Sequence, residues 1–358
     1  MLPLISVVLP VRNERTMLPK LLDELLKQNY PANRFEILVV DGRSSDGTAD
    51  LVRRRYSDKL VKVRVLDNAK MLTSAGRNVG VRAALGDVIL FMDGHCAIPS
   101  RNLLEDTAAI LGQTGAGCLS RPQPLLAPSA TRTGEVIAQA RTSWLAGGRN
   151  VRAYDMHTTG FVDPVIGGAT YRREVFDKVG FFDENFDGCE DVEFNTRVRK
   201  AGIQAYTDPK LAVYYAPRTN IRGLFQQMIR NGRGRMRLAR KHPETFSKST
   251  LLPVAIWLAV VLAPLAWMLL PRTAALLATL PLAAFALIAA AASLQMAFRH
   301  GFAYAWKGPR VFGAMFCGLG AGLLVEALRP VRPAQPVVLE MLRPAPELQV
   351  AEEAKRAA

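Results

Sequence analysis

The stretch Phe35-Glu-Ile-Leu-Val-Val-Asp-Gly-Arg-Ser-Ser-Asp-Gly-Thr48 decides the fold of the N-terminal half of this 358-residue chain. Phe35–Val40 is apolar apart from Glu36, which is typical of a buried strand, and it ends at Asp41. A glycine-containing turn follows, and Ser45 or Asp46 is a suitable N-cap for a helix over Asp46–Tyr56. A carboxylate at such a strand end can accept hydrogen bonds from a ribose or a base, although Asp and Gly are also ordinary turn formers.

Strand and helix patterns alternate on both sides of this stretch. The alternation predicts an α/β fold in which a parallel sheet is covered by helices on both faces. The expected strands are Leu4–Leu9, Phe35–Val40, Val61–Leu66 and Asp87–Met92, and the expected helices are Glu14–Gln28, Asp46–Tyr56 and Thr73–Leu85.

Polar residues follow three of these strands at the point where each strand ends: Asn13 and Glu14, then Asp41, then Asp93 with His95. Ligands of such folds bind beyond the carboxyl ends of the strands, so we expect these side chains to converge on one edge of the sheet. Asp93 and His95 are two residues apart and can hold one divalent cation that bridges a diphosphate. An ordinary turn with a surface histidine is the alternative.

A further acidic motif, Glu190-Asp-Val-Glu193, begins an expected helix over Glu190–Ala201. Acids are favoured at a helix N-terminus by the helix dipole, so capping alone would explain them. The same dipole would keep Asp191 ionised, as a general base requires. The upstream pair Gly167-Gly168 indicates close approach of the backbone to a ligand.

The pattern is less regular between and after these motifs. Pro122–Met156 mixes Pro, Gly and Ala with arginines, which predicts a loop-rich connection. Val162–Arg172 predicts a strand with a tight glycine turn, and Ile203–Thr207 and Ala212–Tyr215 predict two short strands. Ile221–Leu238 has helical apolar spacing beside arginines, which is typical of an amphipathic interfacial helix.

Membrane signals lie in the C-terminal third. Leu251–Leu270 has no charge in 20 residues and Thr273–Phe298 has none in 26. Each run is long enough to cross about 30 Å of hydrocarbon as a helix. A third stretch, residues 311–328, is shorter and rich in glycine, so a span, a re-entrant segment and an interfacial helix all remain open.

The net charge of +15 has a local origin, because nine Lys or Arg residues lie between Arg218 and Lys248, directly before the first span. This position favours an anionic membrane surface as the partner. The cluster lacks interleaved aromatic residues, which argues against nucleic acid. Met1–Pro10 does not resemble a signal peptide, so we expect a cytosolic N-terminal domain. Four dispersed cysteines give no zinc signature and fit a reducing compartment.

Taken in this order, the motifs over about Leu4–Arg240 resemble those of the family 2 glycosyltransferases, which have the GT-A fold. Within that family, the chain is similar to membrane-anchored exopolysaccharide enzymes of the succinoglycan glucosyltransferase type. The resemblance implies a mixed GT-A sheet with helices on both faces, followed by transmembrane helices. It also implies inverting transfer of a hexose from a nucleotide sugar, expected to be UDP-linked. The matching segments are Val8-Leu-Pro-Val-Arg-Asn-Glu14, Val39-Val-Asp-Gly-Arg-Ser-Ser-Asp-Gly-Thr48, Ala75-Gly-Arg-Asn78, Phe91-Met-Asp-Gly-His95, Gly167-Gly-Ala169 and Glu190-Asp191.

Roles for individual residues follow from the resemblance. It implies that Asp191 is the catalytic base and that Asp93 and His95 bind Mn²⁺ or Mg²⁺. His95 replaces the usual second Asp of the metal motif, and imidazole suits Mn²⁺ better. The donor nucleotide is expected at Pro10, Val11, Asn13, Glu14, Asp41, Arg43, Ser44, Arg77 and Asp93. The acceptor or the diphosphate is expected at Gly168, Ala169, Glu190, Arg230, Arg233 and Arg235.

One departure from the family bears on the product. Processive synthases carry Gln-x-x-Arg-Trp in the interfacial helix, and this chain has Gln227-Met-Ile-Arg230-Asn231. This favours transfer of single sugars to a polyprenyl-linked acceptor over a processive polysaccharide synthase. A second alternative is a non-catalytic nucleotide-binding membrane protein, and Asp191 with the Asp93/His95 pair argues against it because a binding module needs no base. We expect a protein of the bacterial inner membrane, and its oligomeric state stays open. The expected parts are a catalytic domain (1–217), a basic interfacial region (218–250), a membrane region (251–328) and a Pro-rich tail (329–358).

Overall fold

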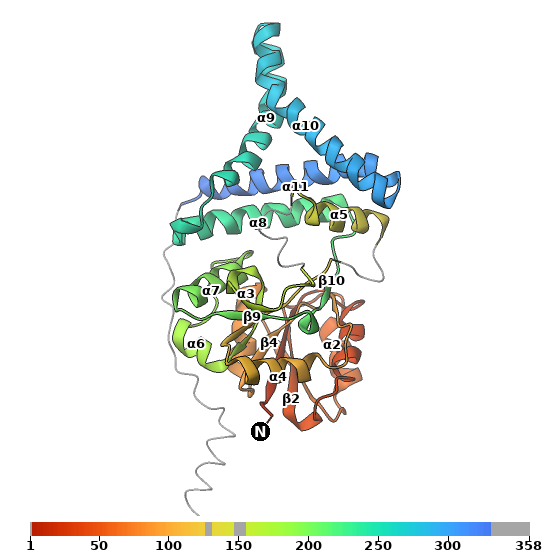
Figure 1. Ribbon diagram of the computed structural model, residues 1–358, viewed down its shortest axis with the longest axis vertical. Helices are drawn as coiled ribbons and strands as arrows, with labels where there is room; N and C mark the ends of the chain where they lie inside the picture. Colours follow the sequence, from red (N-terminus) through yellow and green to blue (C-terminus); the bar gives the residue numbers. More distant parts are fainter. Residues whose placement is uncertain (1, 126–130, 147–154, 331–358) are drawn as a thin grey trace, which may run out of the picture. The chain divides into compact units, whose positions relative to one another are not determined.

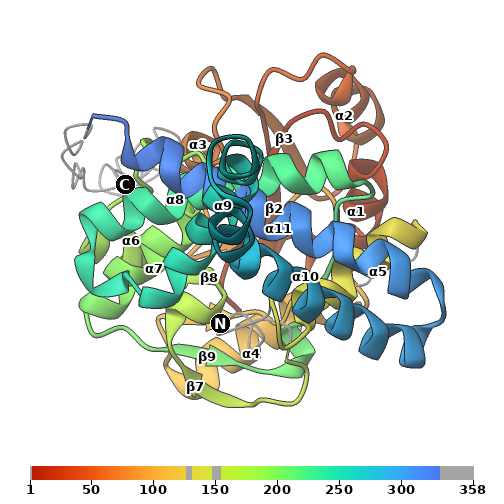
Figure 2. The same ribbon diagram turned by 90° about the horizontal axis from the view of Figure 1, so that it is seen from above.

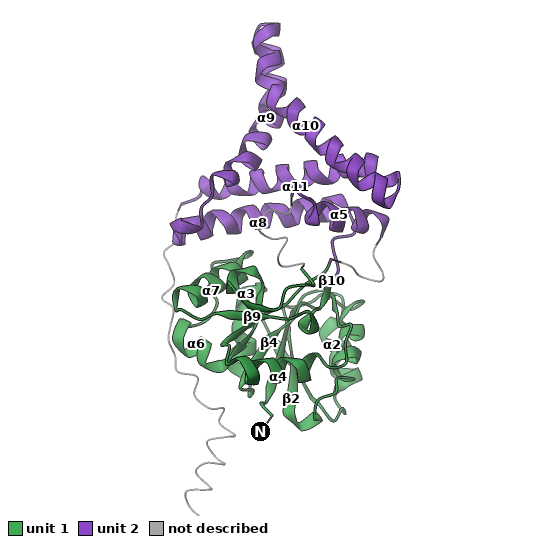
Figure 3. Ribbon diagram, viewed as in Figure 1, with its two compact units in different colours: residues 1–124, 152–215, 334–358 green, residues 125–151, 216–333 purple. Residues whose placement is uncertain are grey.

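The computed structural model describes residues 2–125, 131–146 and 155–330. These residues form two compact units, one built from 2–124 and 155–215 and the other from 125, 131–146 and 216–330 (Figure 3). The expected tail, 329–358, lies almost entirely outside the described residues. Residues 131–146 pack with the second unit, although the sequence places them inside the N-terminal domain.

An eight-stranded mixed sheet forms the first unit, with the strand order β3-β2-β1-β4-β8-β6-β9-β7 (Figure 1). The four expected strands are parallel neighbours, and β8 joins them antiparallel to β4. The mixed GT-A sheet is therefore confirmed. The strands are β1 (Ile5–Val11), β2 (Phe35–Asp41), β3 (Lys62–Asp67), β4 (Val88–Phe91), β6 (Cys118–Ser120), β7 (Gly160–Val162), β8 (Gly168–Arg172) and β9 (Ala205–Thr207), with β5 (Cys96–Ala97) and β10 (Tyr214–Tyr215) paired separately.

Helices cover both faces of this sheet. Alternate residues of β1 point to opposite faces. Val7 and Leu9 pack with the leucines of α1, whereas Val8 packs in a second core with Phe91 and Tyr171. The helices of this unit are α1 (Leu18–Leu25), α2 (Thr48–Tyr56), α3 (Thr73–Ala83), α4 (Leu103–Thr114), α6 (Arg173–Val179) and α7 (Glu190–Lys200), with single 3₁₀ turns at Ala32–Arg34, Pro164–Ile166 and Pro209–Leu211.

The strand register sets where the site forms. Val11 pairs with Asp41 across β1 and β2, and Asp41 pairs with Asp67 of β3, so these strands end level with one another. Val8 pairs with Phe91 at the end of β4, which brings Asp93 to the same edge. The predicted convergence of the polar strand ends thus follows from parallel pairing.

Five helices make up the described part of the second unit: α5 (Arg132–Thr142), α8 (Ile221–Lys241), α9 (Leu251–Leu269), α10 (Arg272–His300) and α11 (Ala303–Ala327), with 3₁₀ turns at Pro243–Thr245 and Lys248–Thr250. Helix α5 falls in a region where a loop was expected. Thr131 caps its N-terminus by accepting a hydrogen bond from the Gly134 amide, and Val136, Ile137 and Ala140 are buried on one face. Its apolar residues are few, and Arg132, Gly134 and Arg141 lie among them, so no apolar stripe stands out in the sequence.

Three helices of this unit are long and apolar enough to cross a membrane: Lys248–Leu269, Arg272–His300 and Ala303–Ala327. Figure 1 shows α11 beside α8, and Figure 2 shows α10 turning back next to α11. The third apolar stretch is thus longer than expected, because the helix begins at Ala303 and includes Lys307 and Arg310.

Glycines allow α11 to approach α8 closely. A Cβ on Gly322 would overlap the carbonyl oxygen of Ile229, whereas a Cβ on Gly313 of the same helix would meet nothing within 4 Å. We expect Gly322→Ala to lower the Tm of the detergent-solubilised protein by about 5 °C, since such overpacking costs about 1–3 kcal/mol.

The matched variant Gly313→Ala should leave the Tm equal or slightly higher, because alanine favours a helix over glycine. Equal Tm values for the two variants, measured by differential scanning fluorimetry, would contradict this close packing.

Candidate active site

The turns after β1 and β2 are joined by hydrogen bonds. The Asn13 amide donates to Ser44 Oγ at 2.8 Å, and Asn13 Oδ1 accepts from the Ser45 amide at 2.9 Å. Ser44 donates to both oxygens of Asp41, at 2.6 Å from Oγ and 3.0 Å from its amide. Asn13 and Arg43 have positive φ values of 57° and 55°, so both turns are sharp. The structure therefore brings together Asn13, Asp41 and Ser44, as the sequence predicts.

The remaining residues of this predicted group lie around it. Pro10 and Val11 are the last two residues of β1 and pair with Val40 and Asp41. Arg43 is exposed, and its Nε lies 3.6 Å from Asp67 Oδ1. This surface ion pair adds little to stability.

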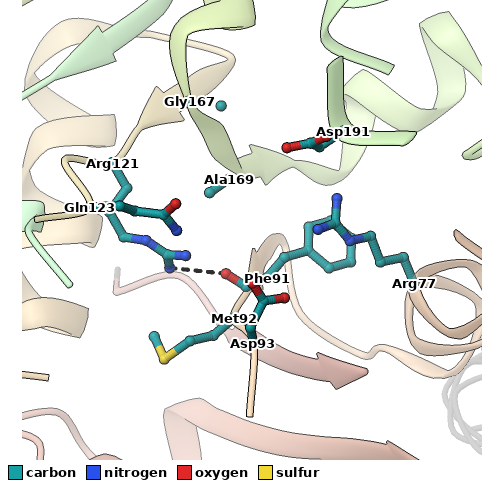
Figure 4. A pocket seen from close by; sticks show the side chains of 10 residues that line it. Arg77, Phe91, Met92, Asp93, Arg121, Gln123, Gly167, Ala169 and Asp191 are labelled. Atoms are coloured by element: carbon teal, nitrogen blue, oxygen red, sulfur yellow. Dashed lines mark hydrogen bonds between the residues drawn. The ribbon is translucent and has the colours of Figure 1, made fainter. Parts of the chain in front are cut away.

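A pocket of about 450 Å³, including its open mouth, lies beyond the end of β4 (Figure 4). Four predicted site residues face one another across it: Arg77, Asp93, Ala169 and Asp191. They come from α3, the end of β4, the start of β8 and the first turn of α7. The full lining is Arg77, Phe91, Met92, Asp93, Arg121, Gln123, Gly167, Gly168, Ala169 and Asp191.

Arg77 is one of two largely buried arginines that line this pocket, the other being Arg121. Its guanidinium lies over the rings of Phe91 and Phe182, at 5.5 and 5.2 Å from the ring centroids. Its Nη2 is 3.5 Å from Glu190 Oε1. Burial alone would lower the pKa of Arg77, but the nearby carboxylates, above all Glu190, raise it. One arginine is thus shared among Glu190 and the two pocket acids, Asp93 and Asp191.

The pKa of Glu190 is raised in the folded protein. Burial, with a further contribution from the charges of Asp191 and Asp93, raises its pKa from 4.5 to about 7, and Arg77 opposes the rise. The raised pKa therefore reflects mainly the removal of the Glu190 carboxylate from water.

This pKa shift makes stability depend on pH. Between pH 4.5 and about 7 the unfolded chain has lost the Glu190 proton while the folded chain keeps it. The folded state therefore loses up to about 1.4 kcal/mol per pH unit across that window. Glu190→Gln carries no such proton, so we expect its Tm relative to wild type to rise from pH 5 to pH 8.

Glu174→Gln is the control for this comparison, because Glu174 is an exposed acid in the first turn of α6. Its Tm should follow wild type at both pH values. A Glu190→Gln curve parallel to that of wild type would show that Glu190 ionises normally in the folded protein.

Asp191 is held at the N-terminus of α7. Cys189, with φ of 60°, turns the chain into the helix, and Asp191 Oδ1 accepts from the Val192 amide at 2.9 Å. The preceding loop is fixed by α3, since Asn78 exchanges two hydrogen bonds of 2.9 Å with the backbone of Phe182. The helix dipole favours a negative charge at this position. Asp191 is therefore positioned as an anionic side chain at the pocket wall.

His95 does not line the pocket. Its Nδ1 lies 2.8 Å from Glu14 Oε1, and its ring packs edge-on against Tyr215 with centroids 4.8 Å apart. Glu14, expected at the donor, is thus a partner of His95. Within the described residues, no three His, Cys, Asp or Glu side chains cluster to hold a metal ion by themselves. A cation here would need ligand oxygens as well as Asp93, and Mg²⁺ is typically held in that way.

Comparison with known proteins identifies the family. The sequence profile of Glycosyl transferase family 2 matches residues 6–180. The succinoglycan biosynthesis protein ExoA of Rhizobium meliloti is 31% identical over 259 residues, which cover 70% of this chain and 74% of that protein. The chain belongs to glycosyl transferase family 2.

Two further relatives of this family 2 glycosyltransferase are also glycosyltransferases by name. The dolichyl N-acetyl-alpha-D-glucosaminyl phosphate 3-beta-D-2,3-diacetamido-2,3-dideoxy-beta-D-glucuronosyltransferase of Methanococcus voltae is 26% identical over 66% of this chain and 74% of the relative. The mannosyltransferase PcManGT of Pyrobaculum calidifontis, solved with GDP-Man and Mn²⁺, is 20% identical, with a TM-score of 0.58 over 92% of this chain and 88% of that one. This second likeness supports the GT-A fold.

The profile match ends before α7, so it does not cover Glu190 and Asp191 of this glycosyltransferase. Their connection to the site comes from the structure. The pocket contains Asp191, and Glu190 is ion-paired to Arg77.

Arg121 and Gln123 line the pocket but were not predicted from the sequence. Arg121 is buried and its Nη1 donates to the Phe91 carbonyl at 2.9 Å, while its Nε has no hydrogen-bond partner among the described residues. Burial lowers its pKa. The sequence signal that could have indicated Arg121 is its position directly after β6, because Asp41 and Asp93 were predicted from their positions after strands. A three-residue strand is too short to be recognised.

The three arginines expected at the acceptor or diphosphate belong to α8 of the second unit. Arg233 Nε lies 3.2 Å from Glu326 Oε2, whereas Arg230 and Arg235 are exposed. Their role toward a phosphate stays a prediction.

Proposed function

We propose that this family 2 glycosyltransferase moves a hexose, with inversion, from a UDP-sugar to a polyprenyl-linked acceptor during surface polysaccharide or glycolipid synthesis. The observation that carries the proposal is the pocket in which Asp93 and Asp191 face each other beside the buried Arg77. In an inverting transfer, the acceptor attacks the anomeric carbon from the face opposite the leaving group. The acid that holds the donor diphosphate and the acid that takes the acceptor proton must therefore lie on opposite sides of the sugar, as Asp93 and Asp191 would.

The donor nucleotide would lie along the joined turns after β1 and β2. Asp41 would accept hydrogen bonds from the ribose or base, since Ser44 fixes the orientation of its carboxylate at 2.6 Å. Asn13 holds the neighbouring turn through the Ser44 and Ser45 contacts. This arrangement presents rigid acceptors, which keeps the entropic cost of donor binding low.

The diphosphate would lie near Asp93. A divalent cation bound there with the phosphate oxygens would neutralise the leaving group. Arg121 lines the same pocket and has an unused donor at Nε, which suits a phosphate oxygen. Arg77 would hold Glu190 and limit the repulsion among the acids. Asp191 would then accept the proton of the acceptor hydroxyl as that oxygen attacks the anomeric carbon.

The acceptor would be presented at a membrane. The three apolar helices of the second unit support this, as does the similarity to a succinoglycan biosynthesis protein and to an enzyme whose name describes a dolichyl-linked acceptor. We place the protein in the bacterial inner membrane with the catalytic unit in the cytosol, because the basic residues of α8 directly precede the first candidate span.

The proposal is tested by measuring the transfer of a radiolabelled sugar to lipid. Membranes containing the protein are incubated with radiolabelled UDP-glucose, UDP-galactose or UDP-N-acetylglucosamine and Mn²⁺, and lipids are extracted into chloroform and methanol. We expect label in a polyprenyl-linked product with one of the sugars, in the β configuration when the donor is α-linked. Radiolabelled GDP-mannose is tested in parallel. Label from that donor alone would overturn the choice of a UDP-linked donor, and an α-linked product would overturn inversion.

A further inference from the structure

Helices α8 and α11 contact each other along most of their length. Gly318 of α11 packs against Phe225 and Met228, and Gly322 packs against Ile229. Further along, Arg240 donates to the carbonyl of Ala327 at 2.8 Å. The contacts advance in the same direction on both helices, so the pair is parallel. From Phe225 to Arg240 they extend over about 22 Å at 1.5 Å per residue.

A buried ion cluster joins the C-terminal ends of the two helices. Glu326 of α11 is buried, and its carboxylate lies 2.7 Å from Arg237 Nε and 3.2 Å from Arg233 Nε. Arg329 adds a longer contact at 3.8 Å. Breaking such a buried pair is costly, which fixes the two helices to each other. If α8 lies along a membrane surface, the C-terminal part of α11 must therefore lie along it too.

Helix α8 cannot cross a membrane. Of its 21 residues, seven are basic: Arg222, Arg230, Arg233, Arg235, Arg237, Arg240 and Lys241. One Arg or Lys at the centre of a bilayer costs at least about 2.5 kcal/mol, and among the described residues Glu326 pairs with two of these seven, Arg233 and Arg237. An amphipathic helix of this kind instead lies along the membrane surface.

Burial separates α11 from the other two candidate spans. Within the second unit, 61% of its most apolar window is buried, against 11% for α9 and for α10. Helices α9 and α10 expose large apolar side chains such as Leu265, Trp267, Leu277 and Leu287, as lipid-facing helices do. Most of the apolar surface of α11 is covered by protein, so its hydropathy does not require lipid around it.

Exposed aromatic side chains lie near the start of α11. Phe298, in the last turn of α10, and Phe302, between α10 and α11, are 90% and 84% exposed. Trp306 in the first turn of α11 is half exposed, and the Arg310 guanidinium lies 4.6 Å from its ring centroid. Trp and cationic side chains of this kind are typical of the membrane–water interface.

We propose that α8 and α11 form a two-helix layer that binds along the membrane surface, and that the chain crosses the bilayer only twice, through α9 and α10. This rests on the membrane anchoring in the proposed function but goes beyond it, because it makes the third candidate span an interfacial helix. The end of α11 then lies on the same side of the membrane as the start of α8 and the catalytic unit that precedes it in the chain.

Cysteine labelling tests this topology. The four native cysteines are replaced by alanine, and single cysteines are introduced at Leu60 of the catalytic unit, Leu270 between α9 and α10, Phe302 between α10 and α11, and Leu328 after α11, all of which are exposed. Spheroplasts of a bacterial host are treated with a membrane-impermeant maleimide before and after permeabilisation. We expect only Leu270→Cys to react in intact spheroplasts, and all four to react after permeabilisation.

Each other pattern has a distinct meaning. If Leu328→Cys reacts together with Leu270→Cys in intact spheroplasts, α11 crosses the membrane and the inference is wrong. If no position reacts before permeabilisation, the α9–α10 hairpin does not cross, and membrane anchoring fails with it. If Leu60, Phe302 and Leu328 react and Leu270 does not, the two-crossing layer stands and the cytosolic placement of the catalytic unit is wrong.

Discussion

Asp191→Asn is expected to lower kcat for sugar transfer by at least about 100-fold, the lower end of what a positioned general base contributes. The amide is nearly the same size as the carboxylate, and its oxygen can still accept the hydrogen bond from the Val192 amide. The fold and donor binding should therefore persist, and only proton acceptance is lost. The measurement is the rate of transfer to the lipid acceptor together with the Kd for UDP.

The control is Asp50→Asn, the same substitution at an exposed acid of α2 that is paired with Arg53 on the surface. It should retain wild-type transfer. If Asp191→Asn is folded, binds UDP normally and still transfers sugar at close to the wild-type rate, Asp191 is not the base.

Arg77→Met should have the second large effect, on both stability and donor use. It leaves Glu190 buried beside Asp93 and Asp191 without its cation. Removing one partner of a buried ion pair costs about 3–5 kcal/mol, so we expect a clearly lower Tm and a higher KM for the donor. Thermal unfolding and initial rates at several donor concentrations measure the two effects.

Two further variants make this prediction decisive. Arg82→Met removes an exposed arginine of the same helix, one that lies over the Phe181 ring at 4.5 Å, and it should change little. Arg77→Lys keeps the charge but not the planar group over the Phe91 and Phe182 rings, so it should fold and still show a raised KM. An Arg77→Met protein with the Tm and KM of Arg82→Met would contradict the role assigned to Arg77.

Much of the N-terminal sheet could be predicted from the sequence. The strands that contain Val8, Val39 and Leu90 are predominantly apolar, and parallel pairing then places the residues after them at one edge. Asn13, Asp41 and Ser44 came together for that reason. Strands β6 and β7 have only three residues each and show no periodicity. Their place in the sheet depends on tertiary pairing, which the sequence alone does not show.

The site was only partly predictable for a related reason. Arg121 resembles a surface arginine in the sequence, and only the folded chain shows that it is buried at the Phe91 carbonyl. His95 matched a metal-ligand position by spacing, yet its contacts with Glu14 and Tyr215 come from segments far away in the chain. Spacing indicates which residues are near a strand end but does not fix where their side chains point.

The third apolar stretch illustrates the same limit in the second unit. Its composition permits a span, and its 25 residues are long enough. The contact with α8 through Gly318, Gly322 and Glu326 distinguishes it from α9 and α10. Hydropathy measures the transfer of a helix to lipid and does not take account of burial against another helix.

Release of UDP from UDP-hexoses by the purified protein tests the central claim most directly. With Mn²⁺ or Mg²⁺ and membrane lipid as acceptor, we expect UDP release that depends on protein and metal and is abolished by EDTA. In Asp93→Asn we expect it to fall at least about 100-fold, because Asp93 is the acid that we propose holds the cation near the diphosphate. No UDP release with any UDP-hexose, or release by Asp93→Asn equal to that of wild type, would contradict the account.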